Sequence, residues 1–185
     1  METIIYFVRH AESPFIADIE RTRGLSEKGE FKSIQVKNIL IDQKIDYILS
    51  SPYERAIQTV KPLADELKKE IIVFEGLKER ALGNIGDIQF KEAKQQLYLD
   101  FSFHFQGGES SKDSQERAIK DMNKILQEFE GKIIVIGTHG DIMTLMMNYF
   151  DDRYDINFWE STSMPDIYQL RFKEDILKEV KRIWE

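Results

Sequence analysis

The sequence of 185 residues contains no cysteine, only four prolines and no long apolar run. Without cysteine, the chain can form neither a disulfide nor a thiolate metal site, which suits a reducing compartment. No apolar stretch approaches the ~20 residues that a membrane-spanning helix needs. The first residues, Met1 to Thr3, lack the basic start and the apolar core of a signal peptide. We therefore expect a cytoplasmic protein.

Positive charge is also scarce. Lys and Arg number 26 against 33 Asp and Glu, which gives a net charge of −7. Binding along a nucleic-acid backbone needs a basic stripe, so we expect neither a nucleic acid nor a membrane as a partner. A hydrophobic content of 42% places the chain in the globular class rather than the disordered one. An anionic substrate would have to be held by a few arginines gathered in a pocket.

Short apolar runs dominate the regular part of the sequence. The runs at 4–8, 46–49, 71–74 and 132–137 are continuous and rich in β-branched residues, which is typical of strands buried on both faces. Helical patterns lie at about 26–41, 56–67, 111–130 and 142–150. This arrangement predicts a single α/β domain with a mostly parallel sheet.

Several local expectations follow from the same patterns. Ser26 is the predicted N-cap of the first helix, and Pro62 is predicted to kink the second. The first helix is expected to bury an apolar face made of Phe31, Ile34, Ile39 and Ile41. Residues 167–172 alternate like a strand with one wetter face, and residues 176–184 fit a helix or a strand equally. Residues 76–109 hold five glycines, which indicate turns.

Polar side chains follow three of the predicted strands. Arg9 and His10 follow the first strand, His139 follows the last, and Arg55 lies just beyond the second. The carboxyl ends of parallel strands form the crevice in which ligands bind. Two of the three histidines stand directly after a buried strand, so we expect them in a functional site. His104 lies among aromatic residues and is expected to be a packed or surface residue.

Two histidines and two arginines suit a tetrahedral dianion. A guanidinium matches phosphate oxygens with a planar fork of donors and keeps its charge near neutrality. A neutral imidazole can attack phosphorus and form a covalent intermediate, while a second histidine stabilises charge on the equatorial oxygens. A leaving alkoxide still needs a proton. Glu79, soon after the third strand, is the candidate acid, although its spacing fits a surface carboxylate equally well.

A series of short motifs resembles, in order, those of the histidine phosphatase superfamily, the phosphoglycerate-mutase-like proteins. The motifs are Arg9-His10-Ala11-Glu12-Ser13, Leu25-Ser26-Glu27-Lys28-Gly29, Ser50-Ser51 with Arg55-Ala56-Ile57-Gln58-Thr59, Leu77-Lys78-Glu79 with Gly83, Gly107-Gly108-Glu109-Ser110, and Thr138-His139-Gly140. The resemblance covers most of the chain and implies a three-layer α/β/α sandwich. It also implies that His10 is the phosphorylated nucleophile, that Arg9, Arg55 and His139 complete the phosphate pocket, and that Glu79 is the proton donor.

The chain departs from the family pattern at a few positions. Ala11 replaces the usual glycine beside the nucleophile, and its methyl group would disfavour a positive φ there. Ile16 stands where many members carry an asparagine that helps to hold the phosphate. Ser13 and Arg23 are further candidates for substrate binding. Arg21 is another, with a solvated loop as the alternative for both of these arginines.

Within the family we expect a phosphatase that hydrolyses phosphate monoesters through a phosphohistidine on His10, because mutases of this type are typically longer. We expect a small phosphorylated metabolite as substrate, no cofactor and no metal. The alternatives are a cofactor-dependent phosphoglycerate mutase-type transfer and a weakly active phosphate-binding regulatory protein. A metallohydrolase with the ligands His10, Glu12, His139 and Asp141 is less favourable, because it would point two arginines at a cation.

Specificity is expected to lie in the segment 84–110, which we predict to be a lid or substrate segment within the one domain 1–185. Its aromatic residues run from Tyr98 to Phe105. A packed peripheral helix and loop is an equally good interpretation of the same residues. The sequence leaves a homodimer open.

Overall fold

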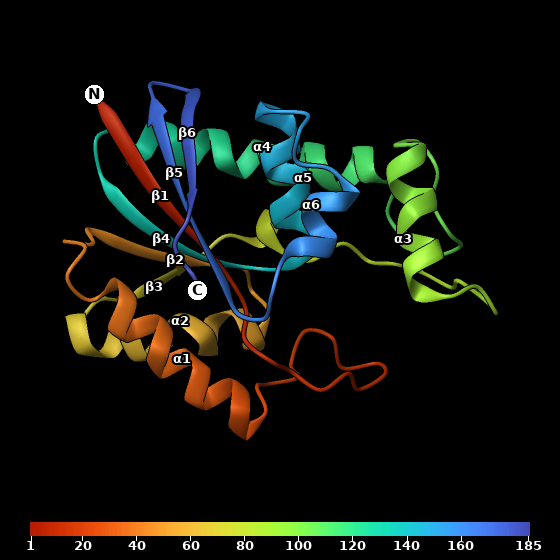
Figure 1. Cartoon of the computed structure of the whole chain (residues 1–185), viewed down its shortest axis with the longest axis horizontal. Helices are drawn as coiled ribbons and strands as arrows, with labels where there is room; N and C mark the ends of the chain where they lie inside the picture. The colour runs from red at the N-terminus through yellow and green to blue at the C-terminus, as the bar shows by residue number, and fades with distance from the viewer.

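A six-stranded sheet with the order β3–β2–β4–β1–β5–β6 organises the chain in the computed structural model, which describes residues 1–185 (Figure 1). The first four strands run parallel: β1 (Glu2–Arg9), β2 (Tyr47–Ser50), β3 (Ile71–Val73) and β4 (Ile133–Thr138). The antiparallel strands β5 (Asp166–Lys173) and β6 (Ile176–Arg182) extend the sheet beyond β1. The predicted α/β class with a mostly parallel sheet is therefore confirmed.

Helices cover both faces of this sheet (Figure 1). They are α1 (Glu27–Leu40), α2 (Glu54–Leu67), the 3₁₀ turn η1 (Glu75–Leu77), α3 (Phe90–Leu99), α4 (Ser111–Glu128), α5 (Gly140–Phe150) and α6 (Ile156–Ser161). None of these helices is both long enough and apolar enough to cross a membrane.

The alternation of side chains along β1 divides the core in two. Ile5 and Phe7 pack in one cluster with residues of α4 and α5, whereas Tyr6 and Val8 pack in a second cluster with residues of α1 and α2. Successive residues of a strand point to opposite faces, so a run that is apolar throughout needs a helical layer on each side. The two clusters are the two interfaces of the three-layer sandwich.

The first helix begins as predicted but buries another face. Ser26 caps it, accepting a hydrogen bond from the backbone N–H of Gly29 at 3.0 Å. Phe31 and Ile34 are exposed, so the predicted apolar face is wrong for these two residues. The buried face is instead Gly29, Ser33, Val36 and Leu40. A Cβ atom on Gly29 would lie 2.2 Å from the carbonyl oxygen of Glu12, so close backbone approach, rather than side-chain size, selects this face.

Other local expectations are settled by the tertiary structure. Pro62 lies inside α2, which runs from Glu54 to Leu67, and the kink there stays a prediction. Residues 176–182 form β6, which pairs with β5, so the strand interpretation is the correct one. The patterns do not predict α6, and they offer a helix in the segment 84–110 only as an alternative, where the structure has α3. α3 has its own small apolar cluster with Phe105, centred on Ala93 and Leu97.

Candidate active site

Three neighbouring parallel strands end at the same edge of the sheet. In the register of β4 with β1 and β2, Arg9 lies opposite Thr138 and Ser50 lies opposite Gly137. The backbone N–H of His10 still donates to the carbonyl of Thr138, at 2.9 Å. The rings of His10 and His139 consequently meet edge to face, with centroids 5.2 Å apart. The two histidines that follow buried strands therefore lie side by side.

The ring of His10 is buried and held in one tautomer. Its Nδ1 lies 2.7 Å from the carbonyl oxygen of Ala11. A carbonyl only accepts, so Nδ1 carries the proton and Nε2 keeps its lone pair. The Nε–H of Arg55 donates to that Nε2 at 3.3 Å. Burial, and then the charge of Arg55, lower the pKa of His10 to about 3. The imidazole is therefore neutral near pH 7, the form that can attack phosphorus.

Ala11 fits its position without backbone strain. It is not among the residues with positive φ, and its side chain is fully buried. Its N–H donates to the hydroxyl of Thr59 on α2 at 3.0 Å, and that hydroxyl in turn donates to the carbonyl of Arg55 at 2.7 Å. The methyl group that replaces the usual glycine therefore leaves the strand end connected to the helix that carries Arg55.

His139 is fully buried and has one nitrogen without a protein partner. Its Nε2 lies 2.7 Å from the hydroxyl of Ser51, which follows β2. Its Nδ1 makes no hydrogen bond within the protein. Burial, followed by Arg55 and His10, lowers the pKa of His139 well below its usual value. A buried polar nitrogen of this kind is costly unless a ligand pairs with it, which suits a role in contacting an oxygen of a bound molecule.

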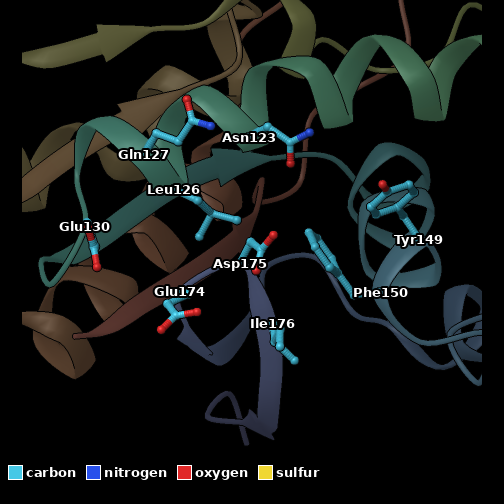
Figure 2. A pocket seen from close by; sticks show the side chains of 9 residues that line it. All are labelled: Asn123, Leu126, Gln127, Glu130, Tyr149, Phe150, Glu174, Asp175 and Ile176. Carbon is cyan, nitrogen blue, oxygen red and sulfur yellow. The ribbon is translucent and has the colours of Figure 1, made fainter.

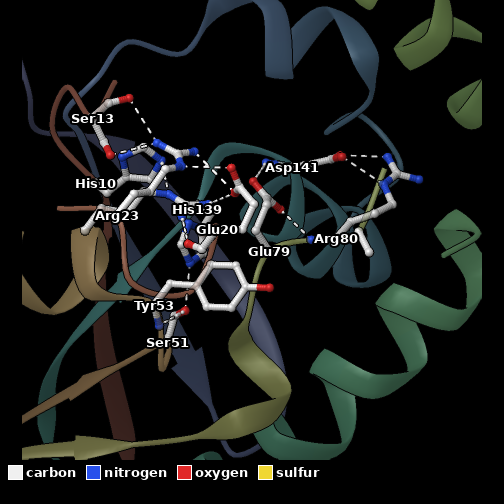
Figure 3. Close-up of polar contacts among 12 residues, drawn as sticks. His10, Ser13, Glu20, Arg23, Ser51, Tyr53, Glu79, Arg80, His139 and Asp141 are labelled. Atoms are coloured by element: carbon white, nitrogen blue, oxygen red, sulfur yellow. Dashed lines mark hydrogen bonds and ion pairs between the residues drawn. The ribbon is translucent and has the colours of Figure 1, made fainter. Parts of the chain in front are cut away.

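Two arginines of the site share a carboxylate that the sequence interpretation missed. Arg55 donates from Nη1 to the carbonyl of Glu20 at 2.6 Å and from Nη2 to its carboxylate at 3.1 Å. Arg23 donates to the same carboxylate from Nε at 2.8 Å and from Nη2 at 3.3 Å. Its Nη1 also reaches the hydroxyl of Ser13 at 2.7 Å. Figure 3 shows the carboxylate of Glu20 beside the guanidinium of Arg23. The one signal for Glu20 in the sequence is its place in the Arg-rich stretch 20–23.

Arg9 reaches the site from the end of β1. Its Nη1 donates to the hydroxyl and the carbonyl of Thr162, at 2.5 and 3.3 Å, while its buried Nε has no partner. Burial lowers the pKa of Arg9, and Glu79 opposes this effect. A Cβ atom on Gly140 would lie 2.7 Å from Cζ of Arg9. A methyl group at position 140 would therefore push the guanidinium of Arg9 aside. Thr162 is a second residue that the sequence does not indicate.

Glu79 is half-buried and caps the N-terminus of α5. Its Oε1 accepts from the backbone N–H groups of Arg80 and Ile142, at 3.0 and 2.8 Å, and its Oε2 accepts from that of Asp141 at 3.1 Å. Unpaired N–H groups in the first turn of a helix attract a carboxylate. Because α5 begins directly after His139, this cap brings Glu79 to the edge of the sheet where the histidines lie (Figure 3).

Some of the candidate residues lie elsewhere. Arg21 forms an exposed ion pair with Glu75 at 2.8 Å, which agrees with the solvated-loop interpretation. The carboxylate of Glu12 pairs with Lys28 at 3.1 Å, and no group of three or more metal-ligating side chains converges anywhere in the structure. The alternative metallohydrolase set is therefore not assembled. His104 is exposed, with its Nδ1 3.1 Å from the carbonyl oxygen of the next residue.

A large hollow lies away from these residues. It has a volume of about 650 Å³ and opens between α4, α5 and the β5–β6 turn (Figure 2). In the antiparallel register of β1 with β5, Lys173 beside that turn lies opposite Glu2 at the start of β1. The hollow is therefore at the opposite end of the sheet from His10. Its charged lining is Glu130, Glu174 and Asp175. An acidic lining repels phosphate, so this hollow is a poor candidate for the predicted phosphate site.

Comparisons with known proteins identify the family and the fold. The sequence profile described as "Histidine phosphatase superfamily (branch 1)" matches residues 5–178. Phosphoglycerate mutase-like protein 4 of Arabidopsis thaliana is 28% identical in an alignment 155 residues long, and the match covers 75% of this chain and 67% of that protein.

Two solved structures are similar to the whole chain. A mycobacterial glucosyl-3-phosphoglycerate phosphatase superposes with a TM-score of 0.77 at 16% identity, covering 98% of this chain and 97% of its own. A phosphoserine phosphatase from Entamoeba histolytica, in complex with 3-phosphoglyceric acid, gives a TM-score of 0.77 at 19% identity, covering 97% of this chain and 96% of its own. At these identities the likeness shows that the fold is shared.

Proposed function

The chain belongs to the histidine phosphatase superfamily (branch 1), and from this premise we propose that it is a metal-independent phosphatase that hydrolyses phosphate monoesters through a phosphohistidine on His10. The observation that carries the proposal is the state of His10. Its Nδ1 proton is held by the carbonyl of Ala11, so the lone pair of Nε2 faces Arg55. A neutral imidazole beside a guanidinium is a nucleophile next to an anion-binding group. The substrate class that we propose is a small phosphorylated metabolite.

Binding of the phosphate replaces an internal contact. Arg23 and Arg55 already hold a carboxylate, that of Glu20, at 2.8 and 3.1 Å. A phosphate dianion carries more charge than a carboxylate and offers three oxygens to these forks. We propose that it displaces Glu20, and that Arg9 and the unpaired Nδ1 of His139 take the remaining oxygens.

The reaction then proceeds in two displacements. Nε2 of His10 attacks phosphorus, the bond from phosphorus to the ester oxygen breaks, and Glu79 gives that oxygen a proton. The arginines and His139 stabilise the charge on the equatorial oxygens during this step. In the second step, water attacks the phosphorus of the phosphohistidine and Glu79 takes a proton from the water. The phosphorus–nitrogen bond breaks, its electron pair returns to Nε2 of His10, and inorganic phosphate leaves.

A second candidate function is that of a weakly active phosphate-binding protein. The contacts of Glu20 with both arginines favour the low activity of this candidate, because the carboxylate competes with a substrate phosphate for the same guanidinium groups. The two candidates differ in turnover. A phosphatase releases phosphate from a substrate panel at a steady rate, whereas a binding protein takes up phosphate or vanadate without release.

Trapping of the intermediate tests the proposal. Labelled substrate is mixed with the enzyme in excess chelator, the reaction is quenched in base, and peptides are mapped. We expect turnover in chelator and label on His10, because a phosphoramidate survives base. His10→Ala should abolish both, and His104→Ala is the matched control that should retain both. Label on another residue, or activity that needs an added divalent ion, would contradict the mechanism.

A further inference from the structure

Asp141, two residues after His139, is a buried carboxylate with four hydrogen-bond donors. Nε and Nη2 of Arg80 bind its two oxygens, each at 2.8 Å. Nζ of Lys94 pairs with one of these oxygens and the hydroxyl of Tyr98 donates to the other, at 2.8 Å for the tyrosine. Asp141 is 1% exposed and Lys94 4%. A carboxylate buried this deeply is stable only when it is fully paired.

The charges around Asp141 keep the carboxylate and the Tyr98 hydroxyl in fixed protonation states near neutral pH. Burial acts to raise the pKa of Asp141, but Lys94 and Arg80 outweigh it and hold this pKa below its usual value. Burial and the neighbouring carboxylate raise the pKa of Tyr98 well above its usual value, so its hydroxyl remains a donor. The cluster is therefore a permanent connection at neutral pH rather than a titrating one.

The same residues hold Glu79 through their backbones. The N–H groups of Arg80 and Asp141 both donate to its carboxylate, and that of Ile142 adds a third bond. Figure 3 shows the guanidinium of Arg80 on Asp141 while its backbone meets Glu79. Arg80 and Asp141 are thus joined to each other by their side chains and to the carboxylate of Glu79 by their backbone N–H groups. A shift of Asp141 therefore moves two of the three N–H groups that place Glu79, its own and that of Arg80.

The other two donors come from α3, within the segment that we predict to be a lid. Lys94 and Tyr98 lie one turn apart on this helix. The hydroxyl of Ser111 adds a second link, since it donates to the carbonyl of Leu97 and accepts from Arg80, each at 2.6 Å. Ala93 and Leu97 of α3 form a small apolar cluster of their own, whereas Tyr98 also packs against the main core. The link from α3 to Asp141 and Arg80 is made by the polar contacts of Lys94, Tyr98 and Ser111.

We infer that Lys94 and Tyr98 are positioning residues that couple the lid helix α3, through Asp141 and Arg80, to the carboxylate of Glu79. This inference rests on the proposed function and deepens it. The lid segment and the proton donor share one rigid connection, so a substrate that orders α3 also aligns Glu79 with the leaving oxygen. The coupling acts on proton transfer to the leaving group and leaves attack by His10 untouched.

The kinetic test compares leaving groups. Lys94→Met removes the charge and keeps the length, and Tyr98→Phe removes only the hydroxyl. Since proton donation contributes about 10²–10⁴-fold, we expect either change to lower kcat/KM for glycerol phosphate by about tenfold or more. Hydrolysis of p-nitrophenyl phosphate, whose leaving group needs no proton, should keep its rate. The matched controls are Lys91→Met, an exposed lysine of the same helix, and Tyr149→Phe, an exposed tyrosine.

Amide hydrogen exchange tests the coupling without catalysis. In Lys94→Met, the amides of Asp141 and Ile142 should exchange faster than in the wild type, and those of Ile134 and Ile136 in β4 should not change. The inference would be overturned by an equal loss of kcat/KM with both substrates, or by unchanged exchange rates of the amides of Asp141 and Ile142. If the wild-type protein hydrolyses neither phosphate, the proposed function fails, and the exchange result alone decides whether α3 is coupled to the acid.

Discussion

Replacement of Glu20 by glutamine should make the protein bind phosphate more tightly. In the ligand-free protein the Glu20 carboxylate makes ion pairs with Arg23 and Arg55, at 2.8 and 3.1 Å. An entering phosphate must break both pairs before it can use the same guanidinium groups. Glutamine keeps the shape of glutamate and can still accept one hydrogen bond, but it has no charge. The substitution therefore weakens the competitor and leaves the arginines in place.

The size of the effect follows from exposure. The Glu20 side chain is 43% exposed, whereas those of Arg55 and Arg23 are 2% and 10% exposed. Exposed ion pairs contribute about 0.2–1 kcal/mol each, and the buried arginines place these two near the upper end. Their sum is about 1–2 kcal/mol, which corresponds to a factor of about 5–30 in the dissociation constant.

Calorimetric titration with phosphate, together with inhibition by vanadate, measures this factor. Glu20→Gln should lower both constants and lower KM, while kcat changes little, because Glu20 does not touch the reacting atoms. Glu30→Gln is the matched control: it removes the same charge from the first turn of α1, where the side chain makes no ion pair. An unchanged or weaker affinity for phosphate in Glu20→Gln would show that the arginines bind phosphate elsewhere.

Three further predictions concern the histidines, the glycine and the acid. Because the pKa of folded His10 is about 3 and that of His139 is also lowered, the unfolded state binds more protons below pH ~6.5. As the pH falls below this value, the free energy of unfolding, measured in urea, should decrease by up to ~1.4 kcal/mol per pH unit for each histidine. His10→Gln should halve this slope, and an unaltered slope would refute the assignment. Gly140→Ala should displace Arg9 and cost about 10²-fold in kcat/KM without lowering the melting temperature, and full activity would argue against the packing requirement. Glu79→Gln should slow alkyl phosphates by about 10²–10⁴-fold and p-nitrophenyl phosphate far less, with equal slowing of both assigning the acid role to another residue.

The parts of the fold that the sequence predicts are those with a local cause. The four parallel strands are visible as apolar runs. β1, β2 and β4 lack alternation because both of their faces are covered, whereas the expectation of burial on both faces is wrong for the edge strand β3, where Ile72 and Val73 are exposed. The cap at Ser26 is visible because it needs only its own helix. The meeting of His10 with His139 is also predictable, since parallel strands end at a common edge and the polar residues come directly after them. This reasoning places Arg55 as well, in the first turn of the helix that follows β2.

The contacts that decide how the site works are not local. Glu20 reaches Arg55 across 35 positions of the chain, and Arg80 reaches Asp141 across 61. The sequence does not reveal these partners, because a contact between two single polar residues produces no repeating pattern along the chain. The buried face of α1 has the same origin: Gly29 is buried because its backbone meets that of Glu12. The sequence by itself therefore determined the layers and the pair of histidines, since periodic burial specifies them. The tertiary structure alone decided which carboxylate occupies the arginines and which residues hold the acid, because a charge in the interior is specified by the partner that folding brings to it.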